Sequence, residues 1–368
     1  MRELKKSTIE VPELVGTIIL FEIGSTTLYM IGSKAKQDAW LAMSIAASIG
    51  LVLALLYLAI YYRDPERDLF ELFRHYLGKR LGTVISLSFV VYFAYEASRV
   101  LRDMGELTTL ILLNKTPLFI IMLLTVIVVG NTVRYGARVL FLTCLALIPI
   151  MILSYLFLGT MIVGTGLVEY EQIMPVLEHG WEPIWNATVP IVAFPFGQLV
   201  LFLVFFPLVK EKRRFRSPVI ISYILVSLFL IVFNQMNFLV LGSYIADKST
   251  IPLLQVIQLI EIIDVFERMD VLFVLILFMG IGIKMAAFFV GAVTGLQKIT
   301  GIGLKKWVIP LGIMIYAASF LSPNYSHHIW LGLEKLPLMF LIFQIAMPLL
   351  LFIIMLAHRK PNTRYRKA

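Results

Sequence analysis

The stretch Phe21-Glu22-Ile23-Gly24-Ser25-Thr26-Thr27 interrupts an otherwise apolar segment, residues 11–32. A second apolar segment, residues 184–209, carries Phe194-Pro195-Phe196-Gly197-Gln198 near its middle. Glycine and serine loosen a helix, and proline removes a backbone donor and clashes with the preceding turn. We therefore predict that each segment forms a helix broken near its middle, although either break alone is also compatible with a simple kink.

The rest of the chain is strongly apolar as well. Of its 368 residues, 60% are hydrophobic and 15% are charged, and its mean hydropathy is +0.89. A soluble fold of this size cannot bury so much apolar surface, whereas a helix of about 20 apolar residues crosses the hydrocarbon core of a bilayer. We predict an all-α integral membrane protein. Its ten transmembrane helices are expected at residues 11–32, 40–62, 83–113, 117–133, 137–164, 184–209, 218–243, 269–297, 307–322 and 335–357.

The basic residues predict the orientation of these helices. Most of the 32 Lys and Arg residues fall on alternate connections, which are the N-terminus, residues 63–82, 134–138, 210–216 and 298–306, and the C-terminal tail. Because cytoplasmic loops carry an excess of Lys and Arg, we expect both termini in the cytoplasm. The net charge of +9 is then topogenic charge that also attracts anionic membrane lipid, and we expect no nucleic-acid partner. The first apolar segment lacks a small-residue cleavage site, so it is expected to be a retained helix.

Motifs of catalysis and metal binding are absent from the sequence. The single cysteine, Cys144, excludes an internal disulfide and has no thiol partner for a metal site. The chain contains no His-Glu-x-x-His, P-loop or Gly-x-Ser-x-Gly pattern. The pair His327-His328 could bind a metal, but a solvated outer loop is the simpler interpretation. We expect no enzyme, no cofactor and no metal.

Two short amphipathic segments lie outside the predicted spans. One, residues 68–74, falls on the cytoplasmic side. The other, residues 251–266, has apolar residues at helical spacing but is too polar to span the bilayer. We expect it to cap the outer mouth of the protein, with a simple connector as the alternative.

The positions of the two breaks predict an internal repeat. They fall in the first spans of two successive five-span halves of a single membrane domain, residues 1–368. Residues 8–164 form repeat one, residues 184–357 form repeat two, and residues 358–368 form a cytoplasmic tail. Five spans per half make the second half inverted, and paired broken helices indicate a transporter-type binding site. Their free backbone N–H and C=O groups can bind the carboxylate and ammonium of an amino acid.

Charged residues occur within the third predicted span, where they are costly unless paired or functional. The spacing allows three ion pairs on one helix, Glu96–Arg99, Arg99–Asp103 and Arg102–Glu106. One interpretation is a structural ladder near the outer end of the helix. The other is that part of it faces an outer vestibule, with Tyr92 and Tyr95 as an aromatic wall.

Lys284 lies alone in the eighth predicted span. It is about 21 Å along the helix from Asp270, past the middle of the membrane. We predict that its ammonium stands where sodium-coupled transporters hold an ion, with Glu22 as its counter-charge. The alternative is that the side chain snorkels to the inner surface.

The chain resembles the spore-germinant-receptor B-subunit family of endospore-forming bacteria, within the amino acid/polyamine/organocation transporter superfamily. The resemblance covers nearly the whole length and the order of elements. The sequences that carry it are Ile23-Gly24-Ser25-Thr26, Leu69-Phe70-Glu71-Leu72 with Leu77-Gly78-Lys79, Pro175-Val176-Leu177-Glu178-His179-Gly180, Phe205-Phe206-Pro207-Leu208 and Glu267-Arg268-Met269-Asp270.

This resemblance implies a ten-helix fold of two inverted repeats and a sensor in the spore inner membrane. The B subunit of that family binds a nutrient, often an L-amino acid, and acts with an A subunit and a C lipoprotein. A proton-coupled amino-acid transporter remains the alternative, because fold does not fix function.

The resemblance also implies which residues form the nutrient site. Helix one reads Gly-Ser-Thr where the family often has Gly-x-Gly, which leaves the identity of the nutrient open. The resemblance implies Gly24, Ser25 and Thr26 on helix one, Phe194, Phe196 and Gly197 on helix six, and the stretch around Lys284 on helix eight. Together with Tyr92 and Tyr95, the aromatic wall inferred from the third span, these are the expected nutrient-binding residues. The expected ion-pairing residues are Glu22, Lys284, Glu96 and Arg99.

Overall fold

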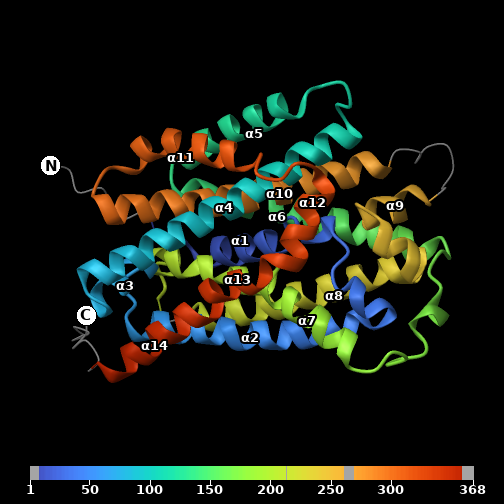
Figure 1. Ribbon diagram of the computed structural model, residues 1–368, viewed down its shortest axis with the longest axis horizontal. Coiled ribbons are helices and arrows are strands. Elements are labelled where there is room, and N and C mark those ends of the chain that lie inside the picture. The colour runs from blue at the N-terminus through green and yellow to red at the C-terminus, as the bar shows by residue number, and fades with distance from the viewer. Residues whose placement is uncertain (1–7, 213, 261–268, 359–368) are drawn as a thin grey trace.

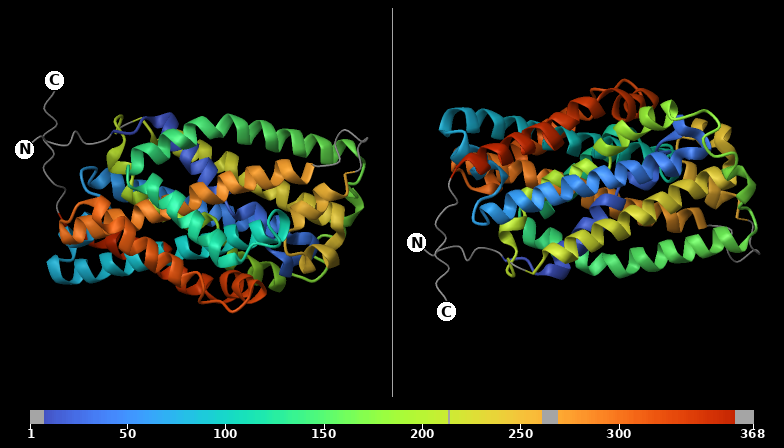
Figure 2. Two further views of the ribbon diagram at one scale, coloured as in Figure 1. Left: turned by 90° about the horizontal axis from the view of Figure 1, so that it is seen from above. Right: turned by 90° about the horizontal axis from the view of Figure 1, so that it is seen from below.

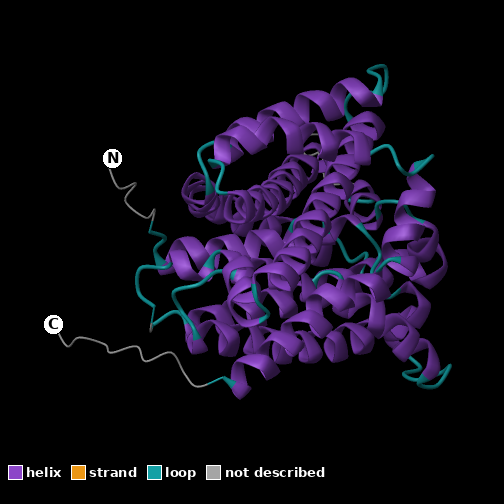
Figure 3. Ribbon diagram, turned by 60° about the vertical axis from the view of Figure 1, so that its left-hand side comes forward, coloured by secondary structure: helices purple, strands orange, loops and turns teal. Residues whose placement is uncertain are grey.

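The computed structural model describes residues 8–212, 214–260 and 269–358. Within these ranges the chain is helical, and its only β pairing is a single bridge between Ile9 and Val209 (Figure 3). The second half of the predicted segment 251–266 and the predicted tail after residue 358 lie outside the described residues. The first half of that segment forms helix α9, Pro252–Gln258.

Helices occupy all ten segments predicted from the sequence. In the described part of the chain, eight helices are long and apolar enough to cross a membrane, and two more, α5 and α11, are shorter at 16 and 15 residues. The ten segments are α1 (Val11–Ile23) with η1 (Thr26–Leu28), α2 (Ala39–Arg63), α4 (Lys79–Ile111), α5 (Leu118–Val133), α6 (Ala137–Gly164), α7 (Glu182–Ala193) with η4 (Phe196–Val204) and η5 (Phe206–Leu208), α8 (Arg216–Lys248), α10 (Met269–Thr300), α11 (Leu304–Ala318), and α13 (Pro337–Leu341) with η8 (Ile342–Ala346) and α14 (Met347–Ala357).

The loop before the last span is more helical than the hydropathy suggests. Helix α12, Tyr325–Trp330, continues into the π-helical turn η7, Leu331–Lys335, before α13 begins. The Asn324 side chain starts α12 by accepting the backbone N–H of His327 at 2.8 Å, which satisfies one free donor of the first turn. As a result, residues 325–335 pack over the centre of the bundle.

The predicted amphipathic segment 68–74 corresponds to α3, Leu69–Tyr76. Asp68 caps this helix by accepting from the N–H groups of Phe70 and Glu71, both at 3.0 Å, and Glu71 bonds back to the Asp68 N–H at 3.1 Å. The apolar residues of α3 are buried, and the helix packs against α4. Lys298 of α10 lies 2.7 Å from Glu71 and 3.2 Å from Asp68, so an ion pair joins α3 to the end of α10.

The broken helices lie inside the bundle. Helix α1 packs against α6, α8 and α10, while α10 runs beside α4, and α2 lies against α7 and α8 (Figures 1 and 2). Both ends of the described chain lie at the end of the bundle that carries α3 and the Ile9–Val209 bridge, which we call the termini face. The opposite end, with α9 and η3 (Tyr170–Ile173), is the loop face.

Candidate functional site

At the first break, the backbone after α1 lies in close contact with the backbone of α10. Helix α1 ends at Ile23, and Gly24 leaves helical geometry after its N–H bonds to Leu20 at 2.9 Å. A Cβ placed on Gly280 of α10 would lie 3.1 Å from the Gly24 Cα. A Cβ placed on Gly24 would lie 2.9 Å from Cδ of Lys284. Glycine at both positions therefore lets α10 pack directly on the broken stretch of backbone.

The second break faces the first across Lys284. Helix α7 ends at Ala193, Phe194 is extended, and η4 begins at Phe196. The Lys284 Nζ lies 5.2 Å from the ring centre of Phe21, next to the first break, and 4.6 Å from that of Phe194 in the second. Both distances fall within the range of cation–π contacts. The two predicted breaks therefore exist, and they meet at one buried lysine.

The predicted ion pair between Lys284 and Glu22 does not form in the structure. Both side chains are fully buried, and neither the ammonium nor either carboxylate oxygen has a hydrogen-bond partner among the described residues. The Lys284 side chain instead points at the two phenyl rings. Its full burial also differs from the alternative in which it snorkels to the surface. Uncompensated buried charges are costly, which marks this pair as a functional candidate.

A small polar cavity lies beside the junction of the two breaks. Its volume is about 20 Å³, which is room for about one water molecule. Its lining residues come from both breaks and from α4, η7 and α13, and they are Ser25, Tyr29, Glu96, Arg99, Val100, Asp103, Phe194, Gln198, Gly332, Leu333 and Phe340. We call it the central cavity.

The central cavity holds polar groups whose hydrogen-bonding capacity is not used. Gln198 Nε2 donates to Glu96 Oε2 at 3.0 Å, but Glu96 Oε1 and Gln198 Oε1 are buried without a partner in residues 8–212, 214–260 and 269–358. The Arg99 guanidinium packs on Gly332 and makes one long contact, 3.4 Å, to the carbonyl of His328. The cavity thus presents two free acceptors and an arginine to any molecule that enters it.

Only one of the three ion pairs predicted along α4 is present. Arg102 and Glu106 are 2.7 Å apart, whereas no ion pair joins Arg99 to Glu96 or to Asp103 in the part of the chain that the structure describes. Asp103 instead accepts from the Tyr29 hydroxyl and lies 3.1 Å from His328 Nε2. The prediction of a self-paired ladder is therefore wrong for its inner part, because these acids face partners on other helices.

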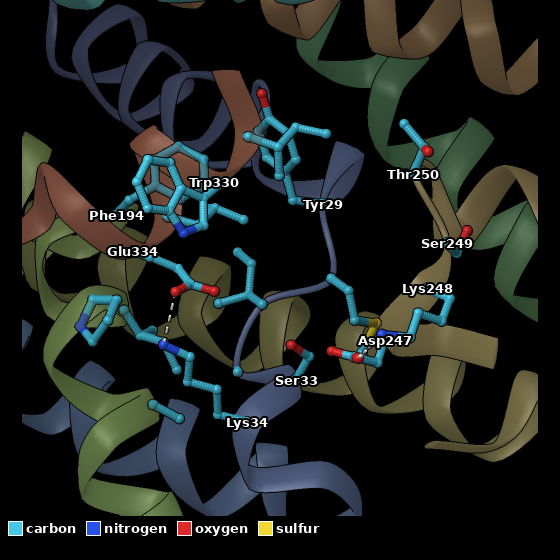
Figure 4. A pocket seen from close by; sticks show the side chains of 18 of the residues that line it. Tyr29, Ser33, Lys34, Phe194, Asp247, Lys248, Ser249, Thr250, Trp330 and Glu334 are labelled. Atoms are coloured by element: carbon cyan, nitrogen blue, oxygen red, sulfur yellow. Dashed lines mark ion pairs between the residues drawn. The ribbon is translucent and has the colours of Figure 1, made fainter. Parts of the chain in front are cut away.

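A larger cavity of about 300 Å³ opens on the loop side of the central cavity, and we call it the outer vestibule. Tyr29 and Phe194 line both cavities, and their rings meet edge to face with centroids 5.9 Å apart. Lys34 and Glu334 form an ion pair at 3.3 Å in the wall of the vestibule, close to Phe194 (Figure 4). The two rings therefore separate the vestibule from the central cavity.

Four of the predicted site residues line the central cavity, and three more lie against the junction. Ser25, Glu96, Arg99 and Phe194 are in the first group, and Glu22, Gly24 and Lys284 are in the second. The other five pack elsewhere, so the structure does not bring them to the central cavity. They are Thr26 beside Asn234, Tyr92 and Gly197 against Gln344, Tyr95 against Phe340, and Phe196 against Tyr223.

The sequence interpretation missed several residues that line the cavity. The sequence contained a clue to Tyr29, Asp103 and Gln198, because each of them lies within one or two helical turns of a break or of Arg99. The sequence contained no clue to Gly332 and Phe340, because only the three-dimensional packing of η7 and α13 brings them to α4.

Comparison with known proteins places the chain among sequences of shared ancestry. The family of spore germination proteins matches residues 8–328. The chain belongs to the spore germination protein family. It is 32% identical to spore germination protein KB of Bacillus subtilis (strain 168) over 362 residues, which cover 97% of each chain. It is 25% identical to spore germination protein A2 of the same strain over 338 residues, covering 89% of this chain and 88% of that one.

Solved structures share the fold. MhsT in complex with L-phenylalanine superposes with a TM-score of 0.66 at 13% identity, covering 94% of this chain and 87% of that one. The nucleobase-cation-symport-1 family transporter Mhp1, closed on bromovinylhydantoin, gives 0.64 at 12% identity, covering 90% and 76%. This spore germination protein therefore has the LeuT-like fold, and the predictions of its family, its membrane nature and its fold class are confirmed.

Proposed function

We propose that this protein is the B subunit of a nutrient germinant receptor, and that it binds an L-amino acid in the central cavity. It signals germination together with an A subunit and a C lipoprotein in the spore inner membrane, with both termini in the cytoplasm. Membership of the spore germination protein family supports the role in germination. The fold shared with MhsT, solved in complex with L-phenylalanine, supports a small-molecule site between the two broken helices.

The observation that supports an amino acid as the ligand is the set of polar groups in the central cavity that lack hydrogen-bond partners among the described residues. A buried acceptor without a partner costs about 1–3 kcal/mol, so a ligand that supplies donors is stabilised there. An α-ammonium can donate to Glu96 Oε1 and Gln198 Oε1, while an α-carboxylate can accept from Arg99. A zwitterion satisfies the free acceptors and the arginine at once.

The small volume of the cavity makes binding depend on movement. About 20 Å³ cannot hold an amino acid, so Tyr29 and Phe194 must separate to join the cavity to the vestibule. A ligand shifts such an equilibrium only by its difference in affinity for the two conformers. Ligand binding would therefore favour a rearranged conformer that the A and C subunits can sense.

A binding screen tests this function. The purified chain in lipid nanodiscs is titrated with the twenty amino acids and with simple sugars, and its thermal midpoint is followed. We expect one or a few L-amino acids to raise the midpoint, and Arg99→Gln to remove the response while the surface variant Arg80→Gln keeps it. A response to sugars alone, or an equal response in Arg99→Gln, would contradict the proposed ligand or site.

A proton-coupled amino-acid transporter is the second candidate, and one observation favours it. Glu22 and Lys284 are buried at the junction without partners in the described ranges, which suits groups that exchange a proton between conformers. Uptake of labelled amino acid by the isolated chain in liposomes under a pH gradient decides between the two. Accumulation without partner subunits would favour the transporter, and binding without accumulation would favour the receptor.

A further inference from the structure

A deep groove runs along the outside of the bundle between α5 and α11, with α10 as its floor. Its volume is about 630 Å³, twice that of the outer vestibule. The walls are almost entirely apolar, and the lining residues are Leu123, Val126, Ile127, Val128, Gly130, Asn131, Thr132, Arg134, Phe289, Val308, Ile309, Gly312, Ile313 and Tyr316.

Two glycines give the groove its depth. A Cβ on Gly130 of α5 would lie 3.6 Å from Phe289, and a Cβ on Gly312 of α11 would lie 3.4 Å from the same ring. Larger side chains at these positions would cover the Phe289 floor. The rim is formed by exposed isoleucines, with Ile309 exposed to 67% and Ile313 to 63%. Such a surface is stable in a bilayer only when apolar chains fill it.

The mouth of the groove on the termini face is strongly basic. Arg134 lines the groove at the end of α5, and Lys305 and Lys306 lie in the first turn of α11. All three side chains are exposed, and none has an ion-pair partner in the described part of the chain. The sequence has no acidic residue between Glu106 and Glu169 or between Asp270 and Glu334. The positive charge is therefore not neutralised by these segments.

Aromatic residues flank the same mouth. Tyr135 is exposed to 66%, and the indole of Trp307 donates to Thr300 Oγ1 at 3.1 Å. Tyrosine and tryptophan gather at the level of lipid headgroups. The polar end of the groove thus lies where the phosphate of a phospholipid lies, and its apolar part lies where the acyl chains lie.

We propose that this groove is a binding site for one anionic phospholipid of the leaflet on the termini face. Its phosphate contacts Arg134, Lys305 and Lys306, and an acyl chain lies over Phe289 between α5 and α11. Basic pockets between membrane helices bind anionic headgroups in this way. A partner helix would cover the apolar walls equally well, but it would leave the three positive charges at the mouth without a counter-charge.

Native mass spectrometry of the full chain tests the site. The protein is reconstituted with equal amounts of phosphatidylglycerol and phosphatidylcholine and then released into mild detergent. We expect one phosphatidylglycerol to remain bound, and each basic residue to contribute about five-fold to its selectivity over phosphatidylcholine. The combined variant Arg134→Gln, Lys305→Gln and Lys306→Gln should lose the bound lipid. The control Lys79→Gln with Arg80→Gln, on the same face outside the groove, should keep it.

A photo-crosslinking residue at Ile309 identifies the occupant in the membranes in which the protein is expressed with its partners. We expect phospholipid adducts there in excess over those at Ile353, an exposed position of α14 outside the groove. Equal retention of the two lipids, or retention unchanged by the combined variant, would mean that the groove holds only bulk lipid and would overturn the proposal. A protein adduct at Ile309 would also overturn it and would assign the groove to a partner helix.

Discussion

Lys284 is the buried residue at which the two broken helices meet. Its ammonium touches the rings of Phe21 and Phe194, and its stem fills the space beside Gly24. Neither its ammonium nor either carboxylate oxygen of Glu22 has a hydrogen-bond partner in the described residues. A buried cation in this position disfavours the empty state and can be compensated when a ligand carboxylate or a conformational change arrives.

Lys284→Met removes this charge and keeps an unbranched side chain that is only one atom shorter. We expect the thermal midpoint of the ligand-free protein to rise, because an unpaired buried charge is lost. We also expect the midpoint shift caused by the amino acid to fall by more than half. Lys79→Met, at an exposed position, is the control. An unchanged ligand response would remove Lys284 from the mechanism.

Glu96→Gln separates charge from shape in the central cavity. The variant keeps an oxygen that can accept from Gln198, so folding should be unaffected. The ligand ammonium would lose a charged acceptor worth about 1.5–3 kcal/mol, and we expect its affinity to fall roughly 10- to 150-fold. Isothermal titration measures this change. Glu171→Gln on the exposed loop face should bind normally, and a Glu96→Gln protein that also does so would contradict our assignment.

At the scale of elements, the sequence predicted the breaks in the helices better than it predicted which side chains contact one another. Gly24 and Pro195 disturb a helix by local chemistry, so their effect was visible in the sequence. The partners of Glu96 and Asp103 were not visible, because they come from η4 and α12. The rule of i,i+4 pairing found Arg102–Glu106, where both residues share one helix, and failed where an acid faces another helix.

The contact between Tyr29, just after η1, and Phe194, just after α7, separates the vestibule from the central cavity, and we propose that it is the outer gate. The Tyr29 ring packs on Phe194, and its hydroxyl bonds to Asp103, which is also bound to His328. Tyr29→Phe keeps the ring and removes a hydrogen bond to a charged group, a loss of about 1.5–3 kcal/mol. We expect the gate to open more often, roughly ten-fold or more.

Cysteine labelling measures this opening. Cys144 is the single cysteine and is buried, so Cys144→Ser gives a background in which Ser25→Cys reports on the central cavity. A maleimide that cannot cross membranes should label the introduced thiol faster in the Tyr29→Phe protein. Equal rates with and without Tyr29→Phe would show that the hydroxyl does not hold the gate.

Helix α3 closes the termini face through Lys298. Burial raises the pKa of the Asp68 carboxyl, and the Lys298 ammonium opposes that rise. Lys298→Met removes both of its ion pairs, which are partly exposed, so we expect a loss of about 1 kcal/mol. Hydrogen exchange of residues 69–76 should then become about five-fold faster, whereas Lys248→Met on the loop face should leave it unchanged. Unchanged exchange in Lys298→Met would mean that apolar packing alone holds α3.

At the scale of the whole molecule, the described residues leave a large cavity on the loop face and a small one at the centre. The vestibule of about 300 Å³ leads to the Tyr29–Phe194 pair, and beyond that pair only about 20 Å³ remains. The lengths of the apolar segments were enough to predict the ten spans, and the structure has helices in all ten of them. The boundaries of the two inverted repeats remain a prediction, as do the sidedness of the membrane and the partner subunits. None of these follows from the packing of a single chain.

The central claim is that the junction of the two broken helices recognises a small zwitterion. Isothermal titration with the amino acid found in the screen, with its methyl ester and with the carboxylic acid that lacks the amino group tests it most directly. We predict that the free amino acid binds and that both analogues bind at least ten-fold more weakly, because the ester leaves Arg99 unsatisfied and the acid leaves Glu96 and Gln198 unsatisfied. Equal affinity for all three molecules would contradict this claim.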